Sequence, residues 1–273
     1  MPELPEVETV RRGLEPHFVG RRLERVEVLD PRLVQPFDPT DIEARLTGRV
    51  VESVERRGKY LLLRLDGGLT AVHHLRMTGS FAGPEAEEPR HVRMRYHVEG
   101  ATGPVRYNDP RRFGTLLVDD SARVDAYLDA RLGPEPLDPA WTGPVLHAAL
   151  QRRHAPLKAV LLDQKVVAGL GNIYVDEACF LAGIRPGTPA DRISGPRAAR
   201  LVEAVRERLL EAIEVGGSTL RDYRGVEGTA GGMQERFLAY GRAGKPCLLC
   251  GTTMRGARIA GRSTSWCPKH QKG

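Results

Sequence analysis

Strand-like and helix-like hydrophobic patterns occupy different parts of this sequence, and the pattern changes near residue 131. Before that point, apolar residues alternate or form short runs at 23–28, 60–65 and 92–98, with glycine and proline but no helical periodicity between them. One helix is predicted ahead of these strands, because apolar residues recur at helical spacing over 5–18. Strands segregated from helices predict an α+β fold whose first part is an antiparallel β-sandwich or barrel.

Helical periodicity dominates the second half and predicts helices at 145–153, 157–167, 173–182 and 197–215. A proline-rich linker at 133–139 precedes these helices. The polar, glycine-rich stretch at 218–232 predicts a long functional or mobile loop. A length of 273 residues fits two domains, each large enough for a core.

The excess positive charge of the chain lies in its last 38 residues. The sequence holds 41 Lys and Arg against 35 Asp and Glu, a formal charge of +6, yet residues 236–273 contain eight basic side chains and no acidic one. A basic tail beside a near-neutral body indicates a surface for a polyanion, nucleic acid first, although a solvated disordered tail is the alternative. With 41% hydrophobic residues the chain is too apolar to be disordered, and no apolar run is long enough to span a membrane. The acidic start is unlike a secretory signal, so we expect a cytoplasmic protein.

Four potential metal ligands lie in the basic tail, with the spacing of a zinc ribbon. Cys247 and Cys250 are separated by two residues, as are Cys267 and His270, with 16 residues between the pairs. Two such knuckles can close a tetrahedron around one Zn²⁺, and the metal would supply folding energy that this segment's few apolar residues cannot. The alternative is a disulfide with unpaired thiols, which a cytoplasmic chain disfavours. Arg262 lies between the knuckles, where it either contacts a phosphate or faces solvent.

The first residues of the chain could supply an amine nucleophile. An initiator Met1 before a small residue is normally removed, which would leave Pro2 with a free secondary amine. An α-amino group has a pKa of about 7.7–8.0 against about 10.4 for lysine, so far more of it is neutral at pH 7 and able to form a Schiff base. Glu3 and Glu6 lie close enough in sequence to move protons. The alternative, a helix start with acids at its positive end, accounts for Pro5 and Glu6 but not for Pro2 and Glu3.

Over essentially its whole length the chain resembles the formamidopyrimidine-DNA glycosylase family of bacterial repair enzymes. The matching motifs are PELPEVET at 2–9, RGKYL at 57–61, HLRMTGS at 74–80, NDPRRFG at 108–114, DQ with GLGNIY at 163–174, and the knuckles of the tail. The resemblance implies a β-sandwich with an N-terminal helix at 1–132, a helix–two-turn–helix domain at 133–235 and a zinc-ribbon hairpin at 236–273. It also implies one structural Zn²⁺ and a monomer acting on duplex DNA with oxidised or abasic lesions.

The resemblance also implies the activity and the roles of individual residues. Oxidised purines are removed through a Schiff base on Pro2, with Glu3 moving protons, and the strand is then cut by β- and δ-elimination. Lys59 and Arg262 complete the catalytic group. The residues implied in DNA binding either fill the space left by the flipped nucleotide or contact the DNA around it; they are Met77, His91, Arg111, Phe113, Lys158 and Asn172.

Two alternative functions and two departures from the family pattern stay open at this point. The same fold serves oxidised-pyrimidine glycosylases, and a non-catalytic protein that binds lesions or abasic sites could use the same basic finger. His270 occupies the place of the family's fourth cysteine, which puts its role as a zinc ligand in question. Arg76 occupies a place where many members have glycine, which bears on how Met77 is presented.

Overall fold

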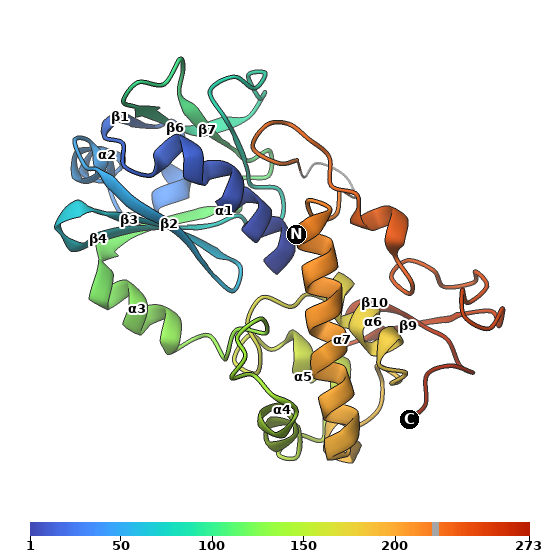
Figure 1. Cartoon of the computed structure of the whole chain (residues 1–273). Coiled ribbons are helices and arrows are strands. Elements are labelled where there is room, and N and C mark those ends of the chain that lie inside the picture. Colours follow the sequence, from blue (N-terminus) through green and yellow to red (C-terminus); the bar gives the residue numbers. More distant parts are fainter. Residues whose placement is uncertain (220–223) are drawn as a thin grey trace. The chain divides into compact units, whose positions relative to one another are not determined.

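The computed structural model describes residues 1–219 and 224–273, which form two compact units. The first unit comprises Met1–Ala130 and Ile213–Gln234, and the second comprises Arg131–Ala212 and Glu235–Gly273. Figure 1 shows the strands of the first unit in blue to green and the helices of the second in yellow to orange.

Two four-stranded antiparallel sheets form the body of the first unit, in the orders β1-β6-β7-β5 and β2-β3-β4-β8. The eight strands are β1 (Leu23–Val28), β2 (Val51–Arg57), β3 (Tyr60–Leu65), β4 (Leu69–His74), β5 (Ser80–Ala82), β6 (Val92–Val98), β7 (Val105–Asn108) and β8 (Thr115–Asp120). The chain passes from one sheet to the other between β4 and β5 and returns between β7 and β8. The predicted antiparallel sandwich is therefore confirmed.

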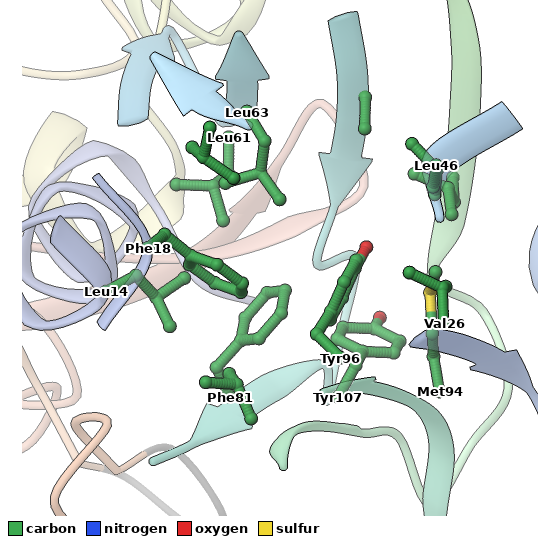
Figure 2. Packing of buried hydrophobic residues seen from close by; sticks show 14 of the residues in the cluster. Leu14, Phe18, Val26, Leu46, Leu61, Leu63, Phe81, Met94, Tyr96 and Tyr107 are labelled. Carbon is green, nitrogen blue, oxygen red and sulfur yellow. The ribbon is translucent and has the colours of Figure 1, made fainter. Parts of the chain in front are cut away.

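Helix α1 (Leu4–Phe18) completes the core of the first unit. Its apolar stripe ends in Leu14 and Phe18, which are fully buried, and the Phe18 ring meets Tyr96 of β6 edge to face with 5.4 Å between ring centroids. Figure 2 shows both aromatic rings beside Phe81 and Tyr107 within the same cluster. Fully burying each large apolar side chain stabilises the fold by about 1.5–3 kcal/mol. The helix predicted at 5–18 thus begins one residue early and ends where expected.

The expectation that no helix lies among the strands was wrong. Helix α2 (Pro39–Leu46) lies between β1 and β2, and helix α3 (Ser121–Asp129) follows β8 within the same unit. An aspartate caps the N-terminus of each helix: Asp38 accepts from Thr40 N at 2.8 Å, and Asp120 accepts from Ala122 N at 2.9 Å. Each buries only two side chains, which is too few for a helical period to stand out in the sequence. The 3₁₀ turns η1 (Pro31–Val34) and η2 (Asp66–Gly68) also belong to this unit.

The second unit contains the helices α4 (Gly143–Leu150), α5 (Leu157–Leu162), α6 (Asn172–Leu181) and most of α7 (Gly195–Glu214), with the 3₁₀ turn η3 (Ala190–Arg192). A further 3₁₀ turn, η4 (Met233–Arg236), has residues in both units. Helix α5 stops five residues before its predicted end. The Gln164 side chain donates to the carbonyls of Leu162 and Leu170 and accepts from Gly169 N, so it organises a loop there. No helix among the described residues is long and apolar enough to cross a membrane.

The tail forms an antiparallel hairpin of β9 (Arg255–Ile259) and β10 (Arg262–Trp266). Ala260 and Gly261 turn the chain with positive φ angles of 50° and 72°. Strand β10 packs against α6, and the side chains beneath the hairpin form a small core; its members are Phe180, Ala239, Cys247, Met254 and Cys267. The predicted hairpin is confirmed.

Candidate functional site

The N-terminal residues are buried beside charged groups. Pro2 is buried, and Glu3 and Glu6 are 3% and 2% exposed. The backbone N of Glu3 donates to Glu6 Oε2 at 2.9 Å, which holds the start of α1. Burial lowers the pKa of the α-amino group at Met1; Glu3 and Glu6 oppose this shift, whereas Lys59 and Arg111 add to it. A lowered pKa favours the neutral, nucleophilic amine at this end of the chain.

Glu6 also connects α1 to the segment that follows α7. Its Oε1 accepts from Ser218 N at 2.8 Å and from Ser218 Oγ at 2.9 Å. Gly217 precedes Ser218 with φ 79°, and a Cβ there would lie 3.0 Å from Glu6 Cγ. No local sequence pattern indicates this contact, because 212 residues separate the partners. Part of the predicted loop at 218–232 falls on 220–223 and lies outside the described residues.

Lys59 sits in the turn between β2 and β3, after Gly58 with φ 57°. Its side chain is 6% exposed. The ammonium is close enough to His74 to help lower the pKa of that imidazole to about 3, after the larger effect of burial and that of Arg76. Since Lys59 also acts on the α-amino group at Met1, the structure brings this predicted catalytic lysine to the N-terminus.

Two exposed loops carry the side chains expected to enter DNA. We call residues 75–79 and 109–114 the probe loops. Met77 is 39% exposed and Phe113 51% exposed, although both are large and apolar. The Arg111 guanidinium carbon lies 4.7 Å from the centroid of the Phe113 ring, a cation–π contact at the surface. His91 is also exposed. It lies beside the second loop, because its carbonyl accepts from Asp109 N and its own N donates to Asn108 Oδ1.

In the second unit, Lys158 and Asn172 both donate to the backbone carbonyl of Ser263. The distances are 2.9 Å from Lys158 Nζ and 3.2 Å from Asn172 Nδ2. Asn172 is the first residue of α6 rather than its cap, which is Gly171. Lys158 is fully buried, whereas Arg262, the residue before Ser263, is exposed. Two residues implied in DNA binding therefore converge on the backbone beside Arg262.

Three cysteine sulfurs form a site that could hold a metal ion. The ligand atoms of Cys247, Cys250 and Cys267 lie within 4.8 Å of one another, and Cys250 Sγ is 3.5 Å from Cys267 Sγ. Hydrogen bonds from Thr252 lower the pKa of the Cys250 thiol to about 7, which favours the thiolate that binds metal. His270 does not belong to this group of ligand atoms, because its Nε2 pairs instead with the Phe180 carbonyl at 2.8 Å.

Each unit thus gathers part of the predicted site. Pro2, Glu3 and Lys59 lie in the first unit with the two probe loops and His91; Lys158, Asn172, Arg262 and the cysteines lie in the second. Sequence reasoning missed the polar side chains that hold these groups, which are Thr78, Asp109, Asp176 and Ser218. Each acts through a partner at least 18 residues away, so no local motif reveals it.

Comparisons with known proteins give a consistent result along the chain. The family model described as the formamidopyrimidine-DNA glycosylase N-terminal domain matches residues 1–116, and the one described as the H2TH domain of the same enzyme matches residues 132–224. A formamidopyrimidine-DNA glycosylase of Rhodospirillum rubrum is 48% identical, with 100% of each chain covered. One of Symbiobacterium thermophilum is 47% identical over 99% of this chain and 89% of its own.

Solved structures agree with these relatives. The MutM (Fpg) protein of Thermus thermophilus superposes with a TM-score of 0.88 at 44% identity, covering 99% of this chain and 98% of that one. The Lactococcus lactis Fpg, in complex with DNA containing an abasic site, superposes with a TM-score of 0.89 at 34% identity, covering 99% and 100%.

Proposed function

Because the chain belongs to the formamidopyrimidine-DNA glycosylase family, we propose that it excises oxidised purines from duplex DNA through a Schiff base on Pro2. It is a base-excision-repair enzyme that acts both as a glycosylase and as a lyase at abasic sites. The observation that carries the proposal is the N-terminus, where buried Pro2 is followed by the buried Glu3 and Glu6, and where Lys59 and these two acids act on the adjoining α-amino group of Met1.

The chemistry begins once Met1 is removed and Pro2 carries the free amine. That amine attacks the anomeric carbon of the damaged nucleotide, the base departs, and the resulting iminium acidifies the neighbouring sugar proton. Successive β- and δ-elimination then break the strand on both sides of the sugar. Glu3 donates and accepts the protons, and the buried ammonium of Lys59 and the guanidinium of Arg262 assist.

The damaged nucleotide has to leave the stack before Pro2 reaches it. Met77, Arg111 and Phe113 fill the space that it leaves, which agrees with the exposure of Met77 and Phe113 on the probe loops. His91 contacts the DNA near these loops. Asn172 and Arg262 hold phosphates, and Lys158 serves the same contact indirectly by holding the Ser263 carbonyl beside Arg262.

A zinc ion completes the tail in this proposal. Cys247, Cys250 and Cys267 supply three thiolates, which supports Zn²⁺ over a harder cation. His270 is the proposed fourth ligand. Its Nε2 pairs with the Phe180 carbonyl, as the second nitrogen of a zinc-bound imidazole commonly does, which leaves Nδ1 as the atom that would bind the metal. Bound zinc would supply folding energy to the hairpin that bears Arg262.

We propose a division of labour along the chain. We assign catalysis to residues 1–132, helical DNA binding to 133–235 and the zinc finger to 236–273. We further propose that the enzyme acts in the cytoplasm as a monomer.

Borohydride trapping tests the reaction. The mature protein, with Pro2 verified as the first residue by mass spectrometry, is incubated with duplex DNA holding 8-oxoguanine opposite cytosine. A covalent adduct is expected, and a variant extended before Pro2 should give none. Failure of the verified protein to trap would overturn the Schiff-base assignment. A parallel duplex with an oxidised pyrimidine reports lesion preference, since faster cleavage there would favour the alternative activity.

A further inference from the structure

The topology of the sandwich places the two probe loops side by side. One loop joins β4 to β5 and the other joins β7 to β8, and each passes between the sheets. They start and finish on paired residues: His74 faces Thr115 across β4 and β8, and Ser80 faces Asn108 across β5 and β7. The loops are therefore neighbours at both of their ends. Backbone pairing alone does not connect their tips.

A buried carboxylate makes that connection. Asp109 is 1% exposed, and its Oδ1 accepts from Thr78 Oγ1 at 2.5 Å and from Arg111 N at 3.2 Å. Its Oδ2 accepts from Gly114 N at 2.8 Å. One side chain thus binds the first loop through Thr78 and both ends of the second. Hydrogen bonds to a charged, buried acceptor are the stronger class.

Both loops also rest on the same aromatic ring. Tyr107 is fully buried and packs against His73 and Phe81, each with 5.2 Å between ring centroids (Figure 2 shows Tyr107 and Phe81). A Cβ at Gly79 would lie 2.4 Å from the Tyr107 hydroxyl oxygen, and one at Gly114 would lie 1.8 Å from it. Both glycines are therefore required by close approach to a rigid floor.

The second loop is also fixed from its other side. Arg112 has φ 57°, and its Nε lies 3.0 Å from a carboxylate oxygen of the buried Asp30. With Arg112 held inward at this point, Arg111 and Phe113 stack on each other at the surface. The exposed tips are thus held by backbone hydrogen bonds at Arg111 and Gly114 and by side-chain contacts of Thr78 and Arg112.

We propose that Asp109 is a positioning residue that joins the two probe loops into one rigid wedge, with the Thr78 hydroxyl as the link between them. The inference rests on the proposed function, in which Met77, Arg111 and Phe113 enter the duplex together. Loops that moved independently would have to lose that freedom on each insertion. A joined wedge also fixes where Arg111 meets the orphaned base, so the link contributes to discrimination between opposite bases.

The test compares Thr78→Val with a matched control. Valine keeps the shape of threonine but cannot donate to Asp109. Thr70→Val makes the same change at a fully buried threonine at the far end of β4, where the hydroxyl bonds to Arg64 and Ser121. Asp109→Asn serves as a second variant. Its side-chain NH₂ cannot accept a hydrogen bond, so at least one group that now donates to Asp109 would lose its acceptor.

Three activities are measured: excision of 8-oxoguanine opposite cytosine, its excision opposite adenine, and cleavage of a preformed abasic site. For Thr78→Val we expect kcat/KM on the cytosine-paired lesion to fall about tenfold, with a smaller cytosine-over-adenine preference. Abasic-site cleavage should stay within about twofold, because no base has to be extruded there. Thr70→Val should leave the preference unchanged. An equal fall in all three activities, or no change in any, would overturn the proposal.

Limited trypsin digestion gives a readout that does not depend on activity. Arg76, Arg111 and Arg112 are exposed cleavage sites within the probe loops. Thr78→Val and Asp109→Asn should raise cleavage at these sites at least about fivefold relative to the wild type and Thr70→Val. If the wild type shows no excision yet the loops loosen as expected, the proposed function fails while Asp109 keeps its positioning role. Unchanged cleavage would show that Asp109 does not hold the loops.

Discussion

The Nζ atom of Lys158 lies 2.6 Å from Oδ1 of Asp176, and both side chains are almost completely buried. Lys158 also donates to the Ser263 carbonyl, and Asp176 Oδ2 accepts from Ser265 N at 3.2 Å. One ion pair thus holds β10 on both sides of Thr264, directly after Arg262. The neighbouring acid Glu177 holds the start of the same tail, since its Oε1 accepts from the backbone N of both Ala239 and Tyr240 at 2.8 Å.

Breaking this ion pair should loosen the finger. Lys158→Met leaves the Asp176 carboxylate buried without its counter-ion, so we expect the free energy of unfolding to fall by about 3–5 kcal/mol. Hydrogen exchange should speed up at the amides of residues 263–266, and DNA affinity should fall with it. Lys165→Met, at an exposed lysine, is the control. The double variant Lys158→Met/Asp176→Asn should lose less than Lys158→Met alone, because no unpaired charge remains. Slow exchange in β10 of Lys158→Met would contradict the positioning role.

The burial of Lys158 is an example of what the sequence alone does not predict. Long periodic segments such as α1 and α7 were predictable because many residues repeat one pattern, and the metal knuckles were predictable because their spacing is local. The burial of Lys158 was not, since its partners lie 18 and 105 residues away and a lysine ordinarily faces solvent. The short helices α2 and α3 escaped for the opposite reason: two buried residues each do not define a period. The reacting groups could therefore be proposed from the sequence, whereas the side chains that hold them could not.

The fourth metal ligand is open to a direct test. If His270 ligates zinc, His270→Ala removes a ligand and should speed metal release to a chromophoric chelator by at least about tenfold. His270→Cys should slow release relative to the wild type, because a fourth thiolate suits Zn²⁺ in a closed structural site. Lys269→Ala is the control at an exposed neighbour. Release from His270→Ala at the wild-type rate would show that the imidazole serves only the Phe180 carbonyl.

Two buried histidines make the first unit sensitive to acid. Burial lowers the pKa of both His73 and His74 from the usual 6.5 of a histidine to about 3. A depressed pKa gives stability that is present above pH 6.5 and lost as the pH falls towards 3, because the unfolded chain takes up protons that the folded chain does not. Each histidine should lower the free energy of unfolding by about 1.4 kcal/mol per pH unit within that window.

His74→Asn isolates one of these two protons. The asparagine oxygen can still accept from Arg76 N, as His74 Nδ1 does at 3.0 Å, but it does not titrate. Urea unfolding at pH 6.0, 5.5 and 5.0 should therefore give a shallower fall than in the wild type, by about 1.4 kcal/mol per pH unit. His154→Asn, at a side chain that is 90% exposed, is the control. Parallel pH curves for His74→Asn and the wild type would mean that His74 is protonated in the folded protein.

The close approach of Gly114 to Tyr107 can be measured as a coupling. Gly114→Ala would put a methyl group 1.8 Å from the Tyr107 hydroxyl oxygen, so we expect it to lower the free energy of unfolding by about 2–3 kcal/mol. Removing that oxygen with Tyr107→Phe leaves the ring carbon at 2.9 Å as the nearest contact, which a small shift relieves. The double variant Gly114→Ala/Tyr107→Phe should thus recover at least about 1 kcal/mol relative to additivity, as a double-mutant cycle reports for residues in contact. The cost of Tyr107→Phe alone should be small, because no hydrogen bond to its hydroxyl is present among the described residues. Strict additivity would place the strain of Gly114→Ala elsewhere and remove Tyr107 as the common floor of the two probe loops.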